Sequence, residues 1–210
     1  MILTLEVSSL ACVRGGAAVF SDVSFRLAGG TAMTIRGPNG SGKSSLLRLI
    51  GGLMRPTRGA ILLDHGKGPQ AMDERSRHSH LIGHKLGITD AMSAVGNLRF
   101  QTGLLGGDLS RVESALDRLG LQSFAHQRAG LLSAGQRRRL ALARLMSAPR
   151  PLWLLDEPME SLDAAGETLV QSMLSEHCAS GGVALIATHG IAPRAARFEL
   201  SLVPAEKAAA

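Results

Sequence analysis

The feature that most limits how this chain can fold is an apolar segment that runs directly into a glycine-rich turn. Residues 31–36 have the composition of a buried strand, and residues 43–50 that of a helix stopped by two glycines. The turn between them fits the pattern G-x-x-x-x-G-K-[ST]. Its glycines allow backbone N–H groups to point inward without Cβ clashes, and the helix N-terminus adds partial positive charge. This arrangement predicts a loop that wraps the phosphates of a nucleotide.

Two side chains of this turn have predicted roles in the chemistry. The Lys43 ammonium is expected to reach the β- and γ-phosphates of ATP, and the Ser44 hydroxyl to ligate Mg²⁺. ATP and Mg²⁺ are therefore the expected cofactors. The residues expected to bind the nucleotide here are Gly37, Pro38, Asn39, Gly40, Ser41, Gly42, Lys43, Ser44 and Ser45.

A second segment places two carboxylates at the end of an apolar strand. Leu152–Leu155 is followed directly by Asp156 and Glu157. Ligands gather at the carboxyl ends of parallel strands, so Asp156 is predicted to hold Mg²⁺ through its water shell and Glu157 to activate the attacking water as general base. Adjacent strand residues point to opposite faces, so the two carboxylates are expected to take separate tasks. Alone, such a pair is more often a solvated turn or a helix cap, but the phosphate loop upstream favours catalysis.

Strands and helices alternate along most of the chain, which predicts an α/β fold of the P-loop NTPase type with a mostly parallel sheet. We expect one domain over all 210 residues, with a helical subdomain at about residues 88–148 inserted into the α/β core. The expected strands are Ile2–Val7, Ser24–Leu27, Thr31–Arg36, Gly59–Leu63, Leu152–Leu155 and Val183–Thr188, and the expected helices include Lys43–Ile50 and Ala164–Cys178.

The expected helical stretch, about Met92 to Ser147, carries its own start and stop signals. Ser110 and Glu113 have the spacing of a capping box, in which each side chain bonds the other's backbone. Gly120 is the expected stop of that helix. A further helix after Ser133 shows an apolar face at helical spacing.

The net charge and the aromatic content limit which classes of partner are expected. The net charge of +6 suits nucleic acid or an anionic membrane surface. However, the arginines are scattered apart from Arg137–Arg139, aromatic residues make up only 3%, and tyrosine is absent, so a surface for stacking bases is not expected. We therefore expect no nucleic-acid partner, and we interpret the charge as solvated surface biased toward phosphate and lipid headgroups.

Membrane spans, export signals and disulfides are not expected. No apolar run is long enough to cross a bilayer, and the first residues lack the basic and apolar segments of a secretory signal. The chain is expected to stay in the cytoplasm. Cys12 and Cys178 lie far apart without a C-x-x-C pair, which predicts reduced thiols rather than metal ligands.

A third segment, Leu132-Ser133-Ala134-Gly135-Gln136, opens a basic helical stretch. Ser133 is a natural N-cap, and the N–H groups after it form an anion site. By itself the segment is an ordinary capped helix. Because it lies between the phosphate loop and the acidic strand, the chain resembles the ATP-binding domains of the ABC transporter family, whose signature is L-S-G-G-Q. Ala134 replaces one glycine of that signature.

The resemblance implies a homodimer that sandwiches two ATP molecules. Ser133 and Gly135 of one copy would contact the γ-phosphate held by the phosphate loop of the other, and Gln136 is counted with them among the nucleotide-binding residues. Ser161-Leu162-Asp163 matches the family's D-loop, which crosses the dimer interface. His189, after the apolar strand, matches the switch histidine that touches the γ-phosphate and orders the catalytic water.

Two positions depart from the family pattern. His84 stands where most members carry a glutamine that ligates Mg²⁺, and imidazole suits softer metals. We therefore expect His84 to contact either the attacking water or Mg²⁺ through water. Near Arg14 there is no aromatic residue, where many members stack a tyrosine on adenine. The planar guanidinium of Arg14 is a candidate replacement.

Several stretches resemble the CcmA family of ATP-binding subunits, which serve haem export in cytochrome c-type biogenesis. The resemblance covers nearly the whole chain, and the short length and the segment Ile82-Gly83-His84 are its discriminating parts. It implies haem export or release of a haem-loaded chaperone, integral membrane partners like CcmB and CcmC, and peripheral attachment to the cytoplasmic face of the inner membrane. The similar stretches are Arg36–Arg48, Ile82–Phe100, Leu132–Arg144 and Pro151–Gly166.

No residue shows haem chemistry, and His65, His78 and His80 are expected at the surface rather than as ligands. The alternatives are the ATPase subunit of an ABC transporter for another substrate and a non-transport ABC ATPase that acts on nucleic acid. A P-loop kinase is a third option, but it leaves residues 132–136 unexplained.

Overall fold

The computed structural model describes residues 4–64 and 72–204. The chain forms two compact units. Of the described residues, the first unit contains 4–64, 72–81, 151–157 and 173–204, and the second contains 82–150 and 158–172. Among the described residues, no helix is both long enough and apolar enough to cross a membrane.

An antiparallel sheet forms part of the first unit, with strand order β2-β1-β4. Its strands are β1 (Thr4–Arg14), β2 (Ala17–Ala28) and β4 (Arg58–Asp64). The expected strand that ended at Val7 continues to Arg14, because β1 bulges after Val7, where Ser9 takes a φ of 45°. A bulge shifts the side-chain alternation, so the period-2 pattern in the sequence breaks although the strand does not.

A five-stranded sheet forms the other layer of the first unit, in the order β5-β6-β7-β3-β8. β3 pairs in parallel with β7 and β8, and β6 with β7, which confirms the α/β class with a mostly parallel sheet. All residues of β6 and β7 are buried, as expected for strands covered on both faces. The strands are β3 (Thr31–Arg36), β5 (Ser79–Ile82), β6 (Leu152–Asp156), β7 (Val183–Ala187) and β8 (Ala196–Ser201).

The sequence did not predict β5, β8 or the short helix α2 (Met72–His78). β5 has only four residues, and β8 is largely solvent-accessible and mixes charged with apolar side chains. Short or half-exposed strands carry too little periodicity to be seen in one sequence. Their pairing with buried neighbours makes them strands.

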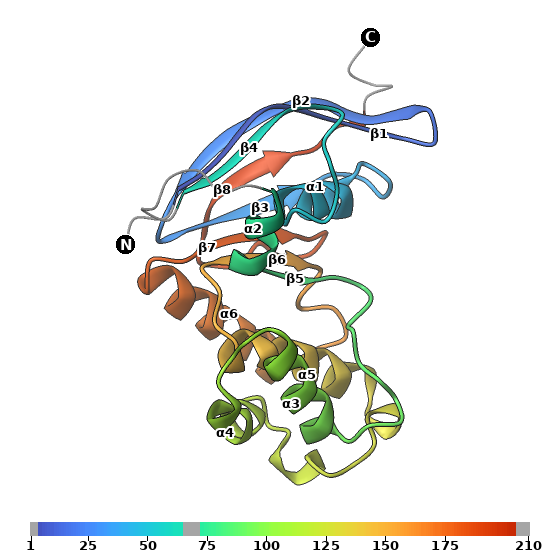
Figure 1. The fold of residues 1–210 in the computed structure, drawn as a ribbon, viewed down its shortest axis with the longest axis vertical. Coiled ribbons are helices and arrows are strands. Elements are labelled where there is room, and N and C mark those ends of the chain that lie inside the picture. The colour runs from blue at the N-terminus through green and yellow to red at the C-terminus, as the bar shows by residue number, and fades with distance from the viewer. Residues whose placement is uncertain (1–3, 65–71, 205–210) are drawn as a thin grey trace. The chain divides into compact units, whose positions relative to one another are not determined.

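Helix α1 (Lys43–Ile50) lies between the antiparallel sheet and strands β6 and β7 in Figure 1. It begins and ends where the sequence predicts. Its apolar face joins the buried core that both sheets share, with Leu46, Leu47, Leu49 and Ile50 at 0% exposure. The glycine-rich turn before α1 is thereby anchored to the centre of the unit.

Helix α6 (Ala164–Ala179) ends on an aromatic pair. The rings of His177 and Trp153 stack with centroids 3.9 Å apart and an interplanar angle of 10°. His177 is buried, and a Cβ at Gly182 would lie 2.2 Å from its ring, so only glycine fits there. The ring is therefore enclosed and kept from water.

The second unit is mostly helical. It contains α3 (Ala94–Leu104), α4 (Val112–Arg118), α5 (Ala134–Ser147) and short 3-10 turns at Leu109–Arg111, Gln122–Phe124 and Ala129–Leu131. The predicted capping box at Ser110 and Glu113 is wrong. Asp108 caps this turn instead, because its Oδ1 accepts the backbone N–H of Ser110 at 2.9 Å and the hydroxyl at 2.6 Å. Gly120, at φ 68°, follows the end of α4 as predicted.

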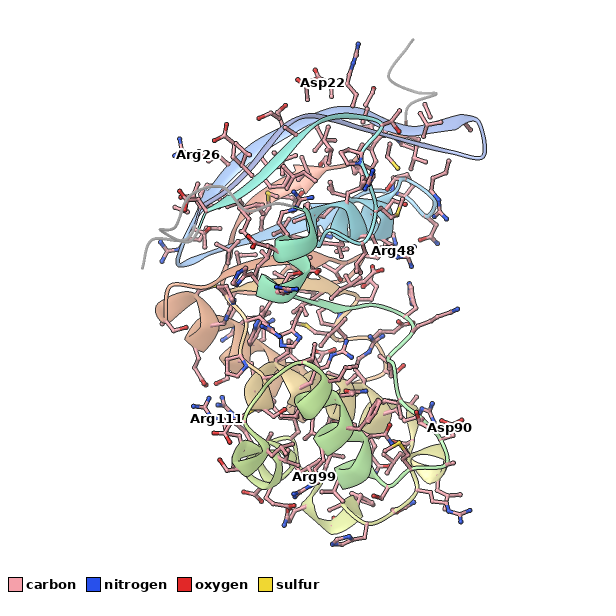
Figure 2. The ribbon with its side chains drawn as sticks, viewed as in Figure 1. Asp22, Arg26, Arg48, Asp90, Arg99 and Arg111 are labelled. Carbon is pink, nitrogen blue, oxygen red and sulfur yellow. The ribbon has the colours of Figure 1, made fainter. Side chains whose placement is uncertain are left out.

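The surface position predicted for the histidines was partly wrong. His80 is buried at 3% exposure on β5, not at the surface, while His78 is half-buried and His65 lies outside the described residues. Exposed arginines come from separate elements, such as Arg26 on β2 and Arg48 on α1 (Figure 2). The positive charge is therefore scattered, as the sequence predicts.

Replacing His177 by phenylalanine should remove an acid-dependent loss of stability. Burial lowers the pKa of His177 from 6.5 to about 4. The unfolded chain binds this proton below about pH 6.5 and the folded chain only near pH 4, so stability is lost as pH falls through this window. The loss from this group should approach about 3 kcal/mol at the acid end. Urea unfolding of the native protein and the variant at several pH values across this window measures the loss. The same pH dependence of the free energy of unfolding in both proteins would contradict this prediction.

Candidate nucleotide site

The glycine-rich turn needs glycine for measurable reasons. Gly42 has a φ of 97°, and a Cβ there would lie 2.5 Å from Val19 Cγ1 and 2.8 Å from Phe20 Cδ1. Gly37 has a φ of 151°, and its Cβ would lie 2.4 Å from the Leu202 carbonyl oxygen. Any larger residue would have to displace backbone or core side chains. The turn therefore presents main-chain atoms rather than side chains toward a ligand.

Lys43 lies at the centre of the candidate site. Its ammonium donates to the carbonyl oxygens of Gly37 at 2.8 Å and Pro38 at 3.2 Å, and it lies 2.9 Å from His189 Nε2. Burial lowers the pKa of Lys43, and the charges of Glu157 and Asp156 oppose that shift. The cation is thus held over the turn by groups that a phosphate could replace.

Ser44 and Asp156 meet although 112 residues separate them. The Ser44 hydroxyl donates to Asp156 Oδ2 at 2.5 Å. Asp156 is the last residue of β6 and is 4% exposed. A hydroxyl and a carboxylate supply the hard oxygen donors that Mg²⁺ prefers, so this pair fits the metal.

Glu157 leaves the strand in a left-handed backbone conformation. Its φ is 49°, and its N–H donates to the Ala187 carbonyl oxygen at 2.8 Å. Glu157 therefore lies beyond β6, and strand alternation does not separate the two carboxylates as predicted; the left-handed turn does. A non-glycine residue here costs on the order of 1–3 kcal/mol, and such strain is typical of functional positions.

Both carboxylate oxygens of Glu157 are occupied. Oε2 accepts the Thr188 hydroxyl at 2.9 Å, and Oε1 accepts the His189 backbone N–H at 2.9 Å. The His189 ring nitrogen Nε2 lies 3.9 Å from Oε1. Lys43, Glu157 and His189, which the sequence predicts from three separate segments, thus lie close together in the structure.

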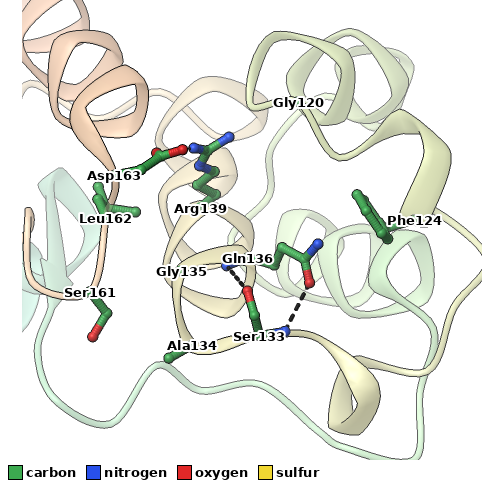
Figure 3. Close-up of a pocket in the computed structure, with 10 residues that line it drawn as sticks. All are labelled: Gly120, Phe124, Ser133, Ala134, Gly135, Gln136, Arg139, Ser161, Leu162 and Asp163. Atoms are coloured by element: carbon green, nitrogen blue, oxygen red, sulfur yellow. Dashed lines mark hydrogen bonds and ion pairs between the residues drawn. The ribbon is translucent and has the colours of Figure 1, made fainter.

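In the second unit, Ser133 is the N-cap of α5, as predicted. Its hydroxyl accepts the Gln136 backbone N–H at 3.2 Å, and the Gln136 side chain accepts the Ser133 N–H at 2.8 Å. This capping box occupies the Gln136 amide oxygen. Ser133 itself is exposed, with its hydroxyl at the tip of the helix (Figure 3).

A pocket of about 480 Å³ lies beside this helix tip (Figure 3). At its edge, a Cβ on Gly135 would lie 2.7 Å from the carbonyl oxygen of Ser161, which has a φ of 65°. Arg139 donates to Asp163 of the same segment. The predicted signature segment and the segment 161–163 therefore form one surface. The lining residues are Gly120, Phe124, Ser133, Ala134, Gly135, Gln136, Arg139, Ser161, Leu162 and Asp163.

His84 belongs to the second unit, in a cluster of charges. Its Nδ1 lies 3.8 Å from Glu160 Oε2, which also accepts from Arg138 Nη2 at 3.1 Å. Arg138, 6% exposed, also donates to the Gly83 carbonyl oxygen at 3.3 Å. Residues 4–64 and 72–204 contain no cluster of three or more histidine, cysteine or acidic side chains able to hold a metal. A role for His84 near Mg²⁺ stays a prediction.

Arg14 occupies the end of the β1–β2 hairpin, paired in register with Ala17 and exposed to solvent. Val19 of the same hairpin packs over Gly42 of the glycine-rich turn. The hairpin therefore borders the turn, but stacking of Arg14 on adenine stays a prediction.

Sequence reasoning missed two groups in the site. Thr188 holds Glu157, and Arg36, the residue before the turn, donates to the Gly190 carbonyl oxygen at 3.0 Å. The signal for Thr188 was its place between a buried strand and a candidate histidine. Arg36 carries no local signal, because its partners lie more than 150 residues away.

A match to a known family decides the broad identity. Residues 20–160 match the family model described as ABC transporter. The chain belongs to the ABC transporter family. Membership of this family identifies an ATPase domain that binds ATP.

Two similar proteins from different bacteria carry the same name. A cytochrome c biogenesis ATP-binding export protein CcmA from Rhodopseudomonas palustris is 44% identical over 197 residues, covering 92% of this chain and 97% of its own. A protein of the same name from Mesorhizobium japonicum is 45% identical over 187 residues, covering 89% and 92%. The predicted resemblance to CcmA proteins is thus confirmed over nearly the full length.

Solved structures of ABC proteins share the fold. One described as an ATP binding subunit of an ABC transporter has a TM-score of 0.84 and 25% identity, and covers 94% of this chain and 85% of its own. A putative ABC transporter ATP-binding protein from Pyrococcus furiosus has a TM-score of 0.81 and 20% identity, covering 95% and 97%. At such identities the likeness concerns the fold.

Replacing Gly135 by alanine should disturb segment 161–163. The new Cβ would lie 2.7 Å from the Ser161 carbonyl oxygen, so backbone must move. We expect a loss of about 1–3 kcal/mol in the free energy of unfolding. Amide hydrogen exchange at residues 161–163 should also accelerate.

The control is Ala134→Gly, which adds no atom and should cost about 1 kcal/mol or less. Unchanged exchange in Gly135→Ala would show that the close approach does not constrain the loop.

Proposed function

We propose that this chain is the ATP-hydrolysing subunit of a membrane ABC complex that exports haem, or releases a haem-loaded chaperone, in cytochrome c-type biogenesis. The full-length similarity to CcmA proteins carries the assignment to this process. The geometry around Lys43 and Glu157 supports hydrolysis as the chemical step.

ATP would occupy the turn formed by residues 37–45. Its phosphates would take the place of the carbonyl groups and His189 nitrogen that now surround the Lys43 ammonium. The exposed backbone of the turn and the N-terminus of α1 would bind the remaining phosphate oxygens. Ser44 and Asp156 would hold Mg²⁺, which would neutralise phosphate charge.

Glu157 would act as general base. Its carboxylate is 18% exposed and already fixed by two donors, so its orientation is set before substrate arrives. His189, whose N–H is one of those donors, would contact the γ-phosphate with its ring and order the attacking water. The two residues share one hydrogen bond, so a shift of either would misplace both.

Two copies would share each nucleotide. The exposed Ser133 cap and Gly135 lie at the N-terminus of α5, whose partial positive charge suits a phosphate bound to another copy. A structural neighbour with a TM-score of 0.81 is described as dimeric and bound to ADP and Pi. We therefore propose a homodimer that closes on ATP and reopens after hydrolysis.

The mostly helical second unit would be the helical subdomain inserted in a single ABC ATPase domain. Integral membrane subunits like CcmB and CcmC would bind the homodimer and place it peripherally at the cytoplasmic face of the inner membrane. The alternative is an ABC ATPase for another transported substrate, with the same site chemistry. Co-purification with the membrane subunits separates these two.

Replacing Glu157 by glutamine should stop hydrolysis but not binding. We expect a fall in ATPase rate of about a hundredfold or more, because the base is removed. The variant should bind ATP and accumulate as dimers, measured by light scattering with MgATP. Normal turnover would rule out Glu157 as the base.

Lys43→Ala, in contrast, should lose ATP binding, measured by fluorescent-nucleotide titration. The control variant Arg48→Ala changes an exposed residue of the same helix and should keep both ATP binding and ATP hydrolysis. Wild-type ATP affinity in Lys43→Ala would contradict the nucleotide site.

Deletion of the gene from its host should abolish covalent haem in c-type cytochromes. Haem staining of membrane and periplasmic fractions measures the loss, and complementation by the native chain but not by Glu157→Gln should restore it. Normal staining in the deletion strain would contradict the role in cytochrome c biogenesis while leaving the ATPase assignment intact.

A further inference from the structure

One arginine connects three segments of the first unit without a role in the chemistry described so far. Arg36 is the last residue of β3 and directly precedes the glycine-rich turn. Its Nε donates to Glu199 Oε2 at 2.9 Å, and its Nη1 donates to the Gly190 carbonyl oxygen at 3.0 Å. Gly190 directly follows His189. The guanidinium therefore links the start of the turn, the histidine segment and β8.

The histidine segment needs such a link. Between Ala187 and Ala196 the backbone is irregular, and pairing with β3 continues through the Thr188 N–H, which donates to the Ile35 carbonyl oxygen at 3.2 Å. Gly190 adds conformational freedom immediately after His189. Within the segment, the Gly190 N–H donates to the Thr188 hydroxyl at 3.0 Å, but its carbonyl group is held by Arg36.

Glu199 aims the guanidinium. The five N–H donors of arginine lie in one plane, so a carboxylate bound at Nε limits the direction of Nη1. Both side chains are partly exposed, at 32% for Arg36 and 51% for Glu199. Ion pairs this accessible contribute little to the free energy of unfolding. The main effect of this pair is therefore to orient the Arg36 guanidinium.

We propose that Arg36 is a positioning residue for ATP hydrolysis. It fixes the position of the main chain after His189 relative to the glycine-rich turn. This inference rests on the proposed ATPase function. His189 contacts Lys43 through its ring and Glu157 through its N–H. Loss of the Arg36 contact releases the segment that carries both interactions.

A double-mutant cycle on the full-length chain tests the proposal. Arg36→Ala, His189→Ala and the double variant are compared by steady-state ATPase kinetics. We expect Arg36→Ala to lower kcat about tenfold and to leave KM for ATP within about twofold. The double variant should be no slower than His189→Ala alone, because Arg36 acts through the histidine segment.

Conservative variants separate geometry from charge. Glu199→Gln keeps an oxygen for Nε and should retain most of the rate, whereas Glu199→Ala should fall toward Arg36→Ala. Arg36→Lys keeps the charge but lacks the planar fork, and should rescue kcat only partly. Arg26→Ala removes an exposed arginine from β2 (Figure 2) and should match the native rate.

Three kinetic outcomes would overturn the inference while leaving the proposed ATPase function intact. A rise in KM with unchanged kcat would make Arg36 a nucleotide-binding residue, and fully multiplicative losses in the double variant would make it independent of His189. Full rescue of kcat by Arg36→Lys would show that only the positive charge at this position matters, and not the planar guanidinium. Absence of ATPase activity in the native chain would overturn the proposed function first, and this inference with it.

Discussion

Parallel pairing of three buried strands places the candidate chemistry. Ile35 of β3 and Asp156 of β6 both pair with Ala187 of β7, so the strands end in one row. The residues that follow this row supply the glycine-rich turn, Glu157 and the histidine segment. The register of parallel strands is fixed by how their buried side chains pack along the strands. The core packing therefore determines which residues lie together at the carboxyl ends of these strands.

The edge also depends on backbone conformations that most residues avoid. Glu157 has a positive φ without being glycine, and it is retained by the bonds it makes to β7 and to the segment after it. Gly42 has no room for a side chain under the β1–β2 hairpin. In both places strain or crowding is tolerated because the surrounding packing allows no alternative, which pre-organises the site for a charged ligand.

In the second unit the helix tip at Ser133 combines two demands. Its capping box with Gln136 secures the helix start, and the same start remains exposed. The close approach of Gly135 to Ser161 ties this tip to the segment after the acidic strand. A surface built this way suits the phosphate contact proposed for a second copy, since a helix N-terminus carries partial positive charge.

The sequence by itself determined the features that are local in the chain: the glycine-rich turn, the buried strand before Asp156, the cap at Ser133 and the α/β class. Each depends on neighbouring residues, whose propensities and periodicity act over a few positions. Only the tertiary structure decided the antiparallel course of β1 past its bulge, the strand β8, and the left-handed turn at Glu157. It alone brought Arg36 to Glu199, because contacts across 163 residues arise from sheet order and packing, which no local pattern encodes.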